Sequence, residues 1–313
     1  MGKNVLIFGV LGFVGKYLAA EFKDHGYEVY GCDMSVKSDI ENGIKYISCN
    51  ILDVSQTRQV INQVKPAYII DLAAISSVSY SWKDPAKTIA VNVEGSVNIF
   101  ETVRQEKIDT KILIIGSSEE YDLSDKPIDE SCKLNSKSPY GLSKISQEYF
   151  SQLYRERYNM KIYCVRAFNH TGVGQTEQFV IPSWCRQAAK LAAENKNGTI
   201  IVGNIDIYRD FSDVRDIVRA YRMILENENS STLYNVGSGN SVKLRDLLEY
   251  IISLSTRKID IMTDPELIRP TDAAAICCCN ELIKREVGWQ PQYSIFDTIQ
   301  AIYSDYYNKF TAN

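Results

Sequence analysis

The chain has 313 residues, which is enough for a large buried core and for two domains. Its 35 lysines and arginines nearly balance 39 aspartates and glutamates, which argues against binding to nucleic acid or to an anionic membrane surface. The sequence shows no repeat or membrane span, and its eight scattered cysteines favour a reduced, cytoplasmic protein.

The first apolar run, residues 4–8, ends at a glycine-rich loop, so we interpret it as a strand and not as a signal peptide. Gly9, Gly12 and Gly15 give the spacing G-x-x-G-x-x-G, and an amphipathic helix to about Asp24 follows. Gly9 permits a tight turn, Gly12 lets backbone approach a pyrophosphate, and Gly15 lets the helix pack on the strand. A glycine-rich turn without a ligand is the alternative. The preceding strand and following helix favour nucleotide binding.

Residues 28–32 form the next predicted strand, and Asp33 ends it. A carboxylate in this place can accept hydrogen bonds from both hydroxyls of an adenosine ribose. It would also repel a 2′-phosphate, which favours NAD over NADP. Lys37 follows closely in the sequence and could offset that repulsion, so NADP remains an alternative.

Further strands are predicted at residues 45–49, 68–70 and 111–115, with helices at 55–64 and 85–107. The strand at 111–115 runs into Gly116-Ser117-Ser118-Glu119-Glu120-Tyr121. Because doubly wound sheets bind ligands at the carboxyl ends of their strands, this segment is a candidate site.

A helix is predicted to begin at Ser138-Pro139, and Tyr140 and Lys144 then share one of its faces. A tyrosine beside an ammonium can act as an acid or base, because the positive charge lowers a pKa that is normally about 10. Most isolated Tyr-x-x-x-Lys pairs are ordinary helix surface. This pair follows a nucleotide-binding loop and a serine-tipped strand, which favours a catalytic role.

Together these motifs resemble the extended short-chain dehydrogenase/reductase family from Val5 to about Gln300. The resemblance implies an α/β fold, with a Rossmann-type doubly wound parallel sheet in residues 1–168 and a smaller nucleotide-sugar-binding domain in residues 169–313. Parts of 203–240 are expected to pack back on the sheet. The alternation of strands and helices favours this fold independently.

The resemblance also implies the catalytic residues, which are Ser117, Tyr140 and Lys144. The cofactor site implied for this chain differs from the family pattern in two segments. Asn50 and Ile51 stand where the family usually has Asp and an aliphatic residue, and Asp71 replaces the histidine of a His-Leu-Ala-Ala segment. The implied cofactor-binding residues are Gly9, Gly12, Phe13, Val14, Gly15, Asp33, Asn50, Ile51, Leu72, Ala73, Ala74, Tyr140 and Lys144. NADH is the favoured cofactor.

Two later segments resemble those of GDP-sugar reductases and dehydratases, at residues 166–175 and 209–216. Asn169 and Arg209 would bind the substrate diphosphate, since a guanidinium fits phosphate oxygens bidentately; a surface salt bridge is the alternative for a lone arginine. The implied substrate-binding residues are Ser117, Ser118, Glu119, Asn169, Arg209, Arg269 and Asp272. No metal site is expected, because the contiguous Cys277-Cys278-Cys279 is poor ligand geometry.

The segments 116–121 and 168–172 most resemble those of reductases that act on GDP-4-keto-6-deoxy-mannose. The implied reaction is NAD(P)H-dependent reduction of the 4-keto group of a GDP-4-keto-6-deoxy-hexose, by a homodimer. A GDP-mannose dehydratase, or another nucleotide-sugar dehydratase or epimerase, is the alternative. Glu119 favours it, because dehydratases carry a carboxylate two positions after the catalytic serine. A catalytically silent nucleotide-binding module is disfavoured by the intact Ser117, Tyr140 and Lys144.

Overall fold

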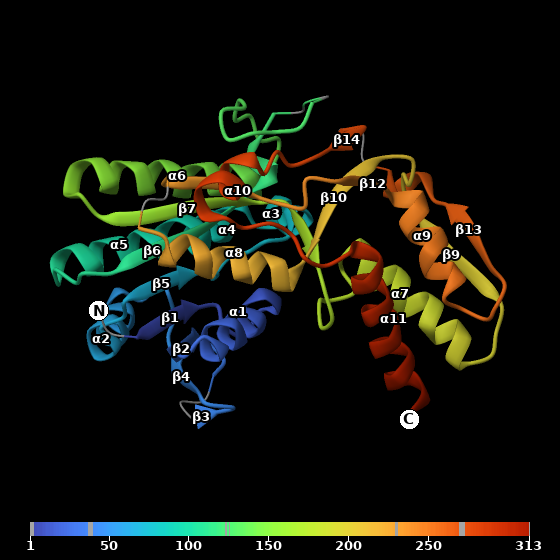
Figure 1. The fold of residues 1–313 in the computed structure, drawn as a ribbon, viewed down its shortest axis with the longest axis horizontal. Coiled ribbons are helices and arrows are strands. Elements are labelled where there is room, and N and C mark those ends of the chain that lie inside the picture. Colours follow the sequence, from blue (N-terminus) through green and yellow to red (C-terminus); the bar gives the residue numbers. More distant parts are fainter. Residues whose placement is uncertain are drawn as a thin grey trace.

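The computed structural model describes residues 3–36, 40–122, 124, 126–228, 231–268 and 273–312. Across these ranges the largest element is an eight-stranded sheet, parallel except for its last pair (Figure 1). Its spatial order is β11 (Leu233–Val236), β7 (Lys161–Ala167), β6 (Lys111–Ser117), β5 (Tyr68–Asp71), β1 (Asn4–Phe8), β2 (Glu28–Asp33), β4 (Ile44–Ser48) and β3 (Ile40–Glu41). The predicted doubly wound parallel sheet is confirmed. Its strand order reverses direction at β1, between β5 and β2, which is where such sheets bind ligands.

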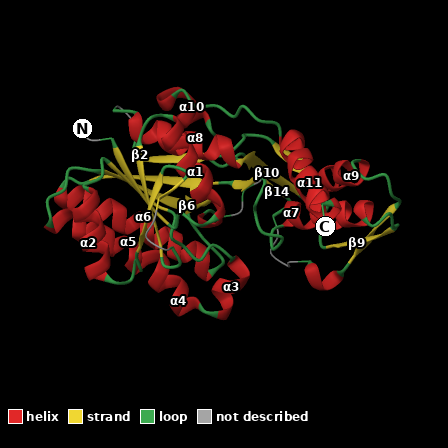
Figure 2. Ribbon diagram, turned by 90° about the horizontal axis from the view of Figure 1, so that it is seen from below, coloured by secondary structure: helices red, strands yellow, loops and turns green. Residues whose placement is uncertain are grey.

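The buried strands alternate between two helical layers. Val5 and Ile7 pack toward one layer, and Leu6 and Phe8 pack toward the other, because successive strand residues point to opposite faces. Figure 2 shows the two layers on either side of the sheet. The first contains α1 (Phe13–Asp24), α8 (Val214–Glu226) and α10 (Glu281–Val287). The second contains α2 (Val54–Val64), α5 (Gly95–Gln105) and α6 (Pro139–Tyr158).

The helix predicted over residues 85–107 is interrupted. It consists of α4 (Pro85–Ile89), a π-helical turn at Ala90–Glu94, and α5. Asn92 lies within the turn and holds neighbouring segments together. Its side-chain oxygen accepts a hydrogen bond from the Ile75 amide at 2.8 Å, and its amide donates to the Ser143 hydroxyl at 2.8 Å. These bonds tie the turn to α6 and to the loop after β5.

A second core lies beyond the large sheet, at the right of Figure 1. It is formed by α7 (Val180–Ala193), α9 (Leu244–Ser253), α11 (Ile295–Thr311) and the parallel pair β9 (Gly198–Val202) and β13 (Ile259–Thr263). A small sheet of β8 (Asn169–Thr171), β10 (Tyr208–Asp213), β12 (Ser241–Lys243) and β14 (Ala275–Ile276) connects the two regions. In the described part of the chain, no helix has both the length and the apolar character needed to cross a bilayer.

The chain returns to the large sheet twice after residue 168. The first return is α8 and β11, inside the 203–240 segment. The second is α10 with Trp289, which is fully buried in the same core and donates a hydrogen bond to the Asp216 carbonyl at 2.9 Å. Sequence patterns gave no indication of this second return, because it depends on long-range packing.

Candidate active site

The glycine loop after β1 lies directly against the end of β5. Gly9 has φ of +78°, and a Cβ on it would lie 2.8 Å from the Ala73 nitrogen. A Cβ on Gly15 would lie 2.5 Å from the Val10 carbonyl oxygen. Both positions therefore require glycine. No described side chain accepts a hydrogen bond from the first turn of α1. The backbone amides of Phe13 and Val14 therefore resemble those that bind phosphate groups at other helix N-termini.

The Phe13 side chain packs on the segment that contains His170 and Gly172. Its ring stacks on His170 with centroids 6.4 Å apart, and it lies close to Gly172. His170 is half-buried, desolvation lowers its pKa, and its Nδ1 lies 3.0 Å from the Phe168 carbonyl oxygen. The Phe13 ring thus connects the glycine loop to the segment that carries Asn169. Its role in binding the cofactor stays a prediction.

The predicted adenosine contacts lie at the carboxyl ends of β2 and β4. Asp33 is half-buried there, and its carbonyl accepts a hydrogen bond from the Cys49 amide at 3.1 Å. Asn50 uses its side-chain oxygen to accept from the Leu52 amide at 3.1 Å. Ile51 is buried against α5, where Asn98 donates to its carbonyl at 3.0 Å. Lys37 lies outside the described residues.

Ser117 and Tyr140 come together through contact between β6 and α6. Ser117 ends β6 and begins a short helical turn at Ser118–Glu120, while Tyr140 lies in the first turn of α6. A Cβ on Gly141 would lie 2.4 Å from the Glu119 carbonyl oxygen, so only glycine allows this approach. Ser117 is close enough to lower the pKa of Tyr140, and both residues are buried.

The pKa of Tyr140 differs from the prediction made from sequence. The pairing with Lys144 was expected to lower it. Instead the pKa is raised, because burial has the largest effect and the charges of Glu120 and Glu119 add to it, while the bond from Ser117 opposes them. The Lys144 ammonium lies 5.9 Å from the centre of the tyrosine ring. Tyr140 is therefore held as a neutral phenol, which is the form that donates a proton.

Lys144 is also buried, on the next turn of α6. Its Nζ donates to the side-chain oxygen of Gln147 at 2.8 Å. Burial lowers its pKa to about 8, opposed by the negative charges of Asp71 and Glu120. Leu72 and Ala73, which lie against Gly9, directly follow Asp71 in the chain. Asp71 therefore lies near both Lys144 and the glycine loop.

A buried charged cluster beneath Ser117 was missed by the sequence interpretation. Glu120 accepts a hydrogen bond from the Ser117 amide at 2.7 Å, and burial raises the pKa of its carboxyl. Arg166 holds Glu148 through two bonds of 2.9 and 2.6 Å and donates to the Tyr121 hydroxyl at 2.8 Å. The only sequence signal was an arginine ending an apolar strand, which indicates a buried partner.

The predicted substrate residues are distributed over two places. Ser118 and Glu119 lie beside Ser117, half-buried and exposed respectively. Asn169 is exposed on β8, which pairs with β10, the strand that carries Arg209. The Arg209 guanidinium donates to the carbonyls of Tyr208 and Ala273, each at 2.8 Å. Arg269 and Asp272 lie outside the described residues.

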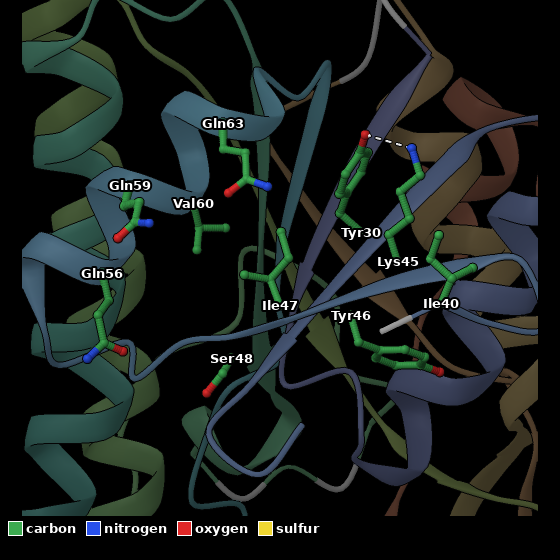
Figure 3. Close-up of a pocket in the computed structure, with 10 residues that line it drawn as sticks. All are labelled: Tyr30, Ile40, Lys45, Tyr46, Ile47, Ser48, Gln56, Gln59, Val60 and Gln63. Carbon is green, nitrogen blue, oxygen red and sulfur yellow. Dashed lines mark hydrogen bonds between the residues drawn. The ribbon is translucent and has the colours of Figure 1, made fainter. Parts of the chain in front are cut away.

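One open pocket lies away from all of these residues. It has a volume of about 460 Å³ and is lined from β2, β4 and α2, among others by Tyr30, Lys45 and Gln63 (Figure 3). Its strands lie on the opposite side of β1 from the strand that ends at Ser117. The candidate active site is therefore located by Ser117, Tyr140 and the carboxyl ends of the strands, and not by this pocket. Within the described ranges, no three His, Cys, Asp or Glu side chains are grouped to hold a metal ion.

The Rossmann-type sheet with its glycine loop defines the class of protein, an oxidoreductase-type enzyme of the extended short-chain dehydrogenase/reductase family. The resemblance noted from the sequence is confirmed. A family model described as GDP-mannose 4,6 dehydratase matches residues 6–302, and the chain belongs to that family.

Named relatives include both reductases and dehydratases. A GDP-6-deoxy-D-mannose reductase from Pseudomonas aeruginosa is 30% identical over 244 residues, covering 77% of this chain and 80% of the relative. A GDP-mannose 4,6-dehydratase from Vibrio cholerae is 24% identical over 341 residues, covering 94% and 91%. The solved structure of RMD from Pseudomonas aeruginosa complexed with NADPH has a TM-score of 0.84 and 25% identity, covering 98% of this chain and 99% of that one. These similarities support nucleotide-sugar chemistry without separating the two reactions.

Proposed function

We propose that the chain reduces the 4-keto group of a GDP-4-keto-6-deoxy-hexose, with NADH or NADPH as the hydride donor. One observation carries the proposal: two buried hydroxyl side chains, Ser117 and Tyr140, lie beside Lys144, and burial raises the pKa of the tyrosine, which favours its protonated form. A reductase needs a proton donor in this position, whereas a dehydratase first needs a base.

The bound dihydronicotinamide supplies a hydride to the keto carbon. In this proposal the Tyr140 hydroxyl donates its proton to the oxygen that becomes an alkoxide, and the Ser117 hydroxyl stabilises that oxygen by a hydrogen bond. The Lys144 ammonium holds the cofactor ribose and stabilises the phenolate that proton transfer leaves on Tyr140. Hydride and proton together convert the ketone to an alcohol.

For the substrate, Asn169 and Arg209 remain the proposed diphosphate ligands, supported by the pairing of β8 with β10. The Arg209 guanidinium is held at this strand by two hydrogen bonds from Nη1 to backbone carbonyls, and its planar shape suits phosphate oxygens. The GDP-sugars named for the relatives support guanosine diphosphate as the carrier.

The enzyme is expected to use NADH with a higher kcat/KM than NADPH. Asp33, half-buried at the end of β2, would face a 2′-phosphate with its carboxylate. Steady-state rates with both cofactors test this. Asp33→Ser should raise kcat/KM for NADPH, and Asp109→Ser, an equal charge change at a salt bridge to Lys161, should not. A clear NADPH preference in the parent, the cofactor bound by the Pseudomonas relative, would contradict the prediction.

A GDP-mannose dehydratase is the second candidate. Glu119 favours it, because this exposed carboxylate lies two residues after Ser117, where dehydratases carry the carboxylate that helps to remove water. In a dehydratase that group would assist the removal of water. In a reductase it would accept a hydrogen bond from a sugar hydroxyl, which requires no proton transfer.

Two assays should separate the candidates. We expect GDP-4-keto-6-deoxy-mannose to oxidise NADH, and GDP-mannose without reduced cofactor to remain unchanged. Glu119→Gln should keep most of the NADH-dependent rate, because an amide oxygen still accepts a hydrogen bond. Formation of a keto sugar from GDP-mannose, with no NADH consumed by the keto substrate, would establish the dehydratase. No turnover in either assay would indicate a catalytically silent module.

The homodimer also remains a proposal. Its support is an exposed apolar face on α6, formed by Leu142, Tyr149 and Leu153, with Ile89 of α4 exposed as well. Residues 142, 149 and 153 recur at helical spacing, as an interface between two copies of the chain requires.

A further inference from the structure

A chain of buried hydrogen bonds runs from Lys144 to Asp71. The Lys144 ammonium donates to the Gln147 side-chain oxygen at 2.8 Å, and the Gln147 amide donates to the Ser96 hydroxyl at 2.6 Å. Ser96 in turn donates to the Asp71 carboxylate at 2.5 Å. The four side chains come from β5, α5 and α6, and each is at most 3% exposed.

The direction of these bonds is set by the lysine. An ammonium has no acceptor, so Gln147 must present its oxygen to Lys144 and its amide to Ser96. The Ser96 hydroxyl then accepts from Gln147 and has a single proton to donate. Its possible acceptors are the Asn92 carbonyl at 3.2 Å and the Asp71 carboxylate at 2.5 Å, and the shorter bond is to the charged group. A positive charge therefore lies at one end of the chain and a negative charge at the other.

Asp71 is also joined to the cofactor-binding segment. Its second oxygen accepts from the Ala73 amide at 3.1 Å, and Ala73 is the residue that a Cβ on Gly9 would strike. Asp71 pairs with Phe8 across the sheet, one residue before the glycine loop. The same carboxylate thus contacts the floor of the nucleotide loop and the network that ends at the lysine.

From this geometry we propose that Asp71 is a positioning residue, which through Ser96 and Gln147 keeps the Lys144 ammonium charged and fixed in place. The proposal rests on the role of Lys144 in the proposed function. An unpaired ammonium in this buried place would tend to lose its proton, since desolvation disfavours the charged form.

The charges that face Lys144 are consistent with this role. They are Asp71 from β5 and Glu120 from the turn after β6, both of which raise the pKa of the lysine against burial, and the Tyr140 ring lies on its own helix. Burial raises the pKa of Asp71 to about 6, opposed by the Ser96 bond and by Lys144. Asp71 is thus ionised and Lys144 protonated between about pH 6 and 8.

The test follows the titration of Lys144 itself, without cofactor or substrate. Lysines labelled at Cε are observed by NMR, and the Lys144 signal is assigned by its loss in Lys144→Met. Asp71→Asn keeps the shape and an acceptor oxygen but removes the charge, so the Lys144 midpoint should fall by roughly 0.5–1 pH unit. The double variant Asp71→Asn/Gln147→Glu returns a carboxylate to the network and should restore the midpoint to at least the parental value.

The matched control is Asp216→Asn in α8. This change removes the charge of a fully buried carboxylate that accepts hydrogen bonds from the Gln292 and Tyr293 amides. It should leave the Lys144 midpoint unchanged. If Asp71→Asn does not fold, Gln147→Met breaks the same chain at its centre and should lower the midpoint too. An unchanged Lys144 midpoint in the folded variants would overturn the proposal.

A second readout is the dissociation constant of NADH between pH 6 and 9, approximately the range over which Lys144 titrates. In Asp71→Asn the loss of affinity at alkaline pH should begin at lower pH, by the same shift as the NMR midpoint. A protein that reduces no keto sugar would fail the proposed function but would still answer the titration experiment, so the two failures are distinguishable.

Discussion

Tyr140→Phe is expected to lower kcat for keto-sugar reduction by about a hundredfold to ten-thousandfold, the usual value of general acid catalysis. The change removes only the Tyr140 hydroxyl, whose pKa is influenced by Ser117. Its ring is buried, so phenylalanine fills the same space and the packing of α6 is kept. NADH affinity should stay within a few-fold of the parental value, because Lys144 and the glycine loop are untouched. Stopped-flow turnover and fluorescence titration with NADH measure the two quantities.

The matched control for Tyr140→Phe is Tyr27→Phe. The Tyr27 hydroxyl donates to Glu226 at 2.8 Å, and Tyr27 precedes β2, at the end of the sheet opposite the glycine loop. Turnover in this variant should remain close to that of the parent. Near-parental turnover in Tyr140→Phe would show that another group supplies the proton, and the proposed acid would be wrong.

Arg166→Met is expected to cost about 3–5 kcal/mol in the free energy of unfolding, because it leaves the buried Glu120 and the half-buried Glu148 without their cation. Arg166 is 3% exposed, and it binds Glu148 through two nitrogens while lying 3.7 Å from Glu120. Since whole domains are stable by about 5–15 kcal/mol, a large part of the stability is at stake. Urea unfolding at pH 7, followed by circular dichroism, measures the loss.

Two further variants separate charge from packing at Arg166. Arg166→Met/Glu148→Leu removes both partners and should recover part of the lost stability, because no unpaired carboxylate remains at Glu148. Arg245→Met breaks a similar two-nitrogen pair with Asp206 on the surface, and its unfolding midpoint should barely move. Equal destabilisation by Arg166→Met and Arg245→Met would contradict the assigned importance of burial.

The strands, helices and family follow from the sequence because their signals are local. Residues 4–8 form β1, the glycines at positions 9, 12 and 15 form the loop, and the helix predicted at Ser138-Pro139 begins at Pro139. Each of these features depends on periodicity, a cap or a turn within a few residues. The assignment to the extended short-chain family depends on several such motifs in order, and the family model confirms it.

The environment of each side chain was decided by the tertiary structure. Glu119 and Glu120 are adjacent and chemically identical, yet Glu119 is exposed, whereas Glu120 is fully buried beneath Ser117 and faces Arg166 of β7. Burial also explains why the pKa of Tyr140 is raised, whereas the sequence predicted a lowered pKa. The Tyr-x-x-x-Lys spacing specifies a neighbouring charge, but not the degree of burial.

The connection between Asp71 and Lys144 likewise required the folded chain. In the sequence, Asp71 stands where the family has a histidine, and Ser96 and Gln147 are ordinary polar residues in two predicted helices. Packing of α5 and α6 on the same face of β5 brings these side chains into hydrogen-bond contact from positions 25 and 51 residues apart. Local patterns determine which elements form and where a loop turns. Desolvation and long-range hydrogen bonds, which set the charge of each group, exist only once those elements pack.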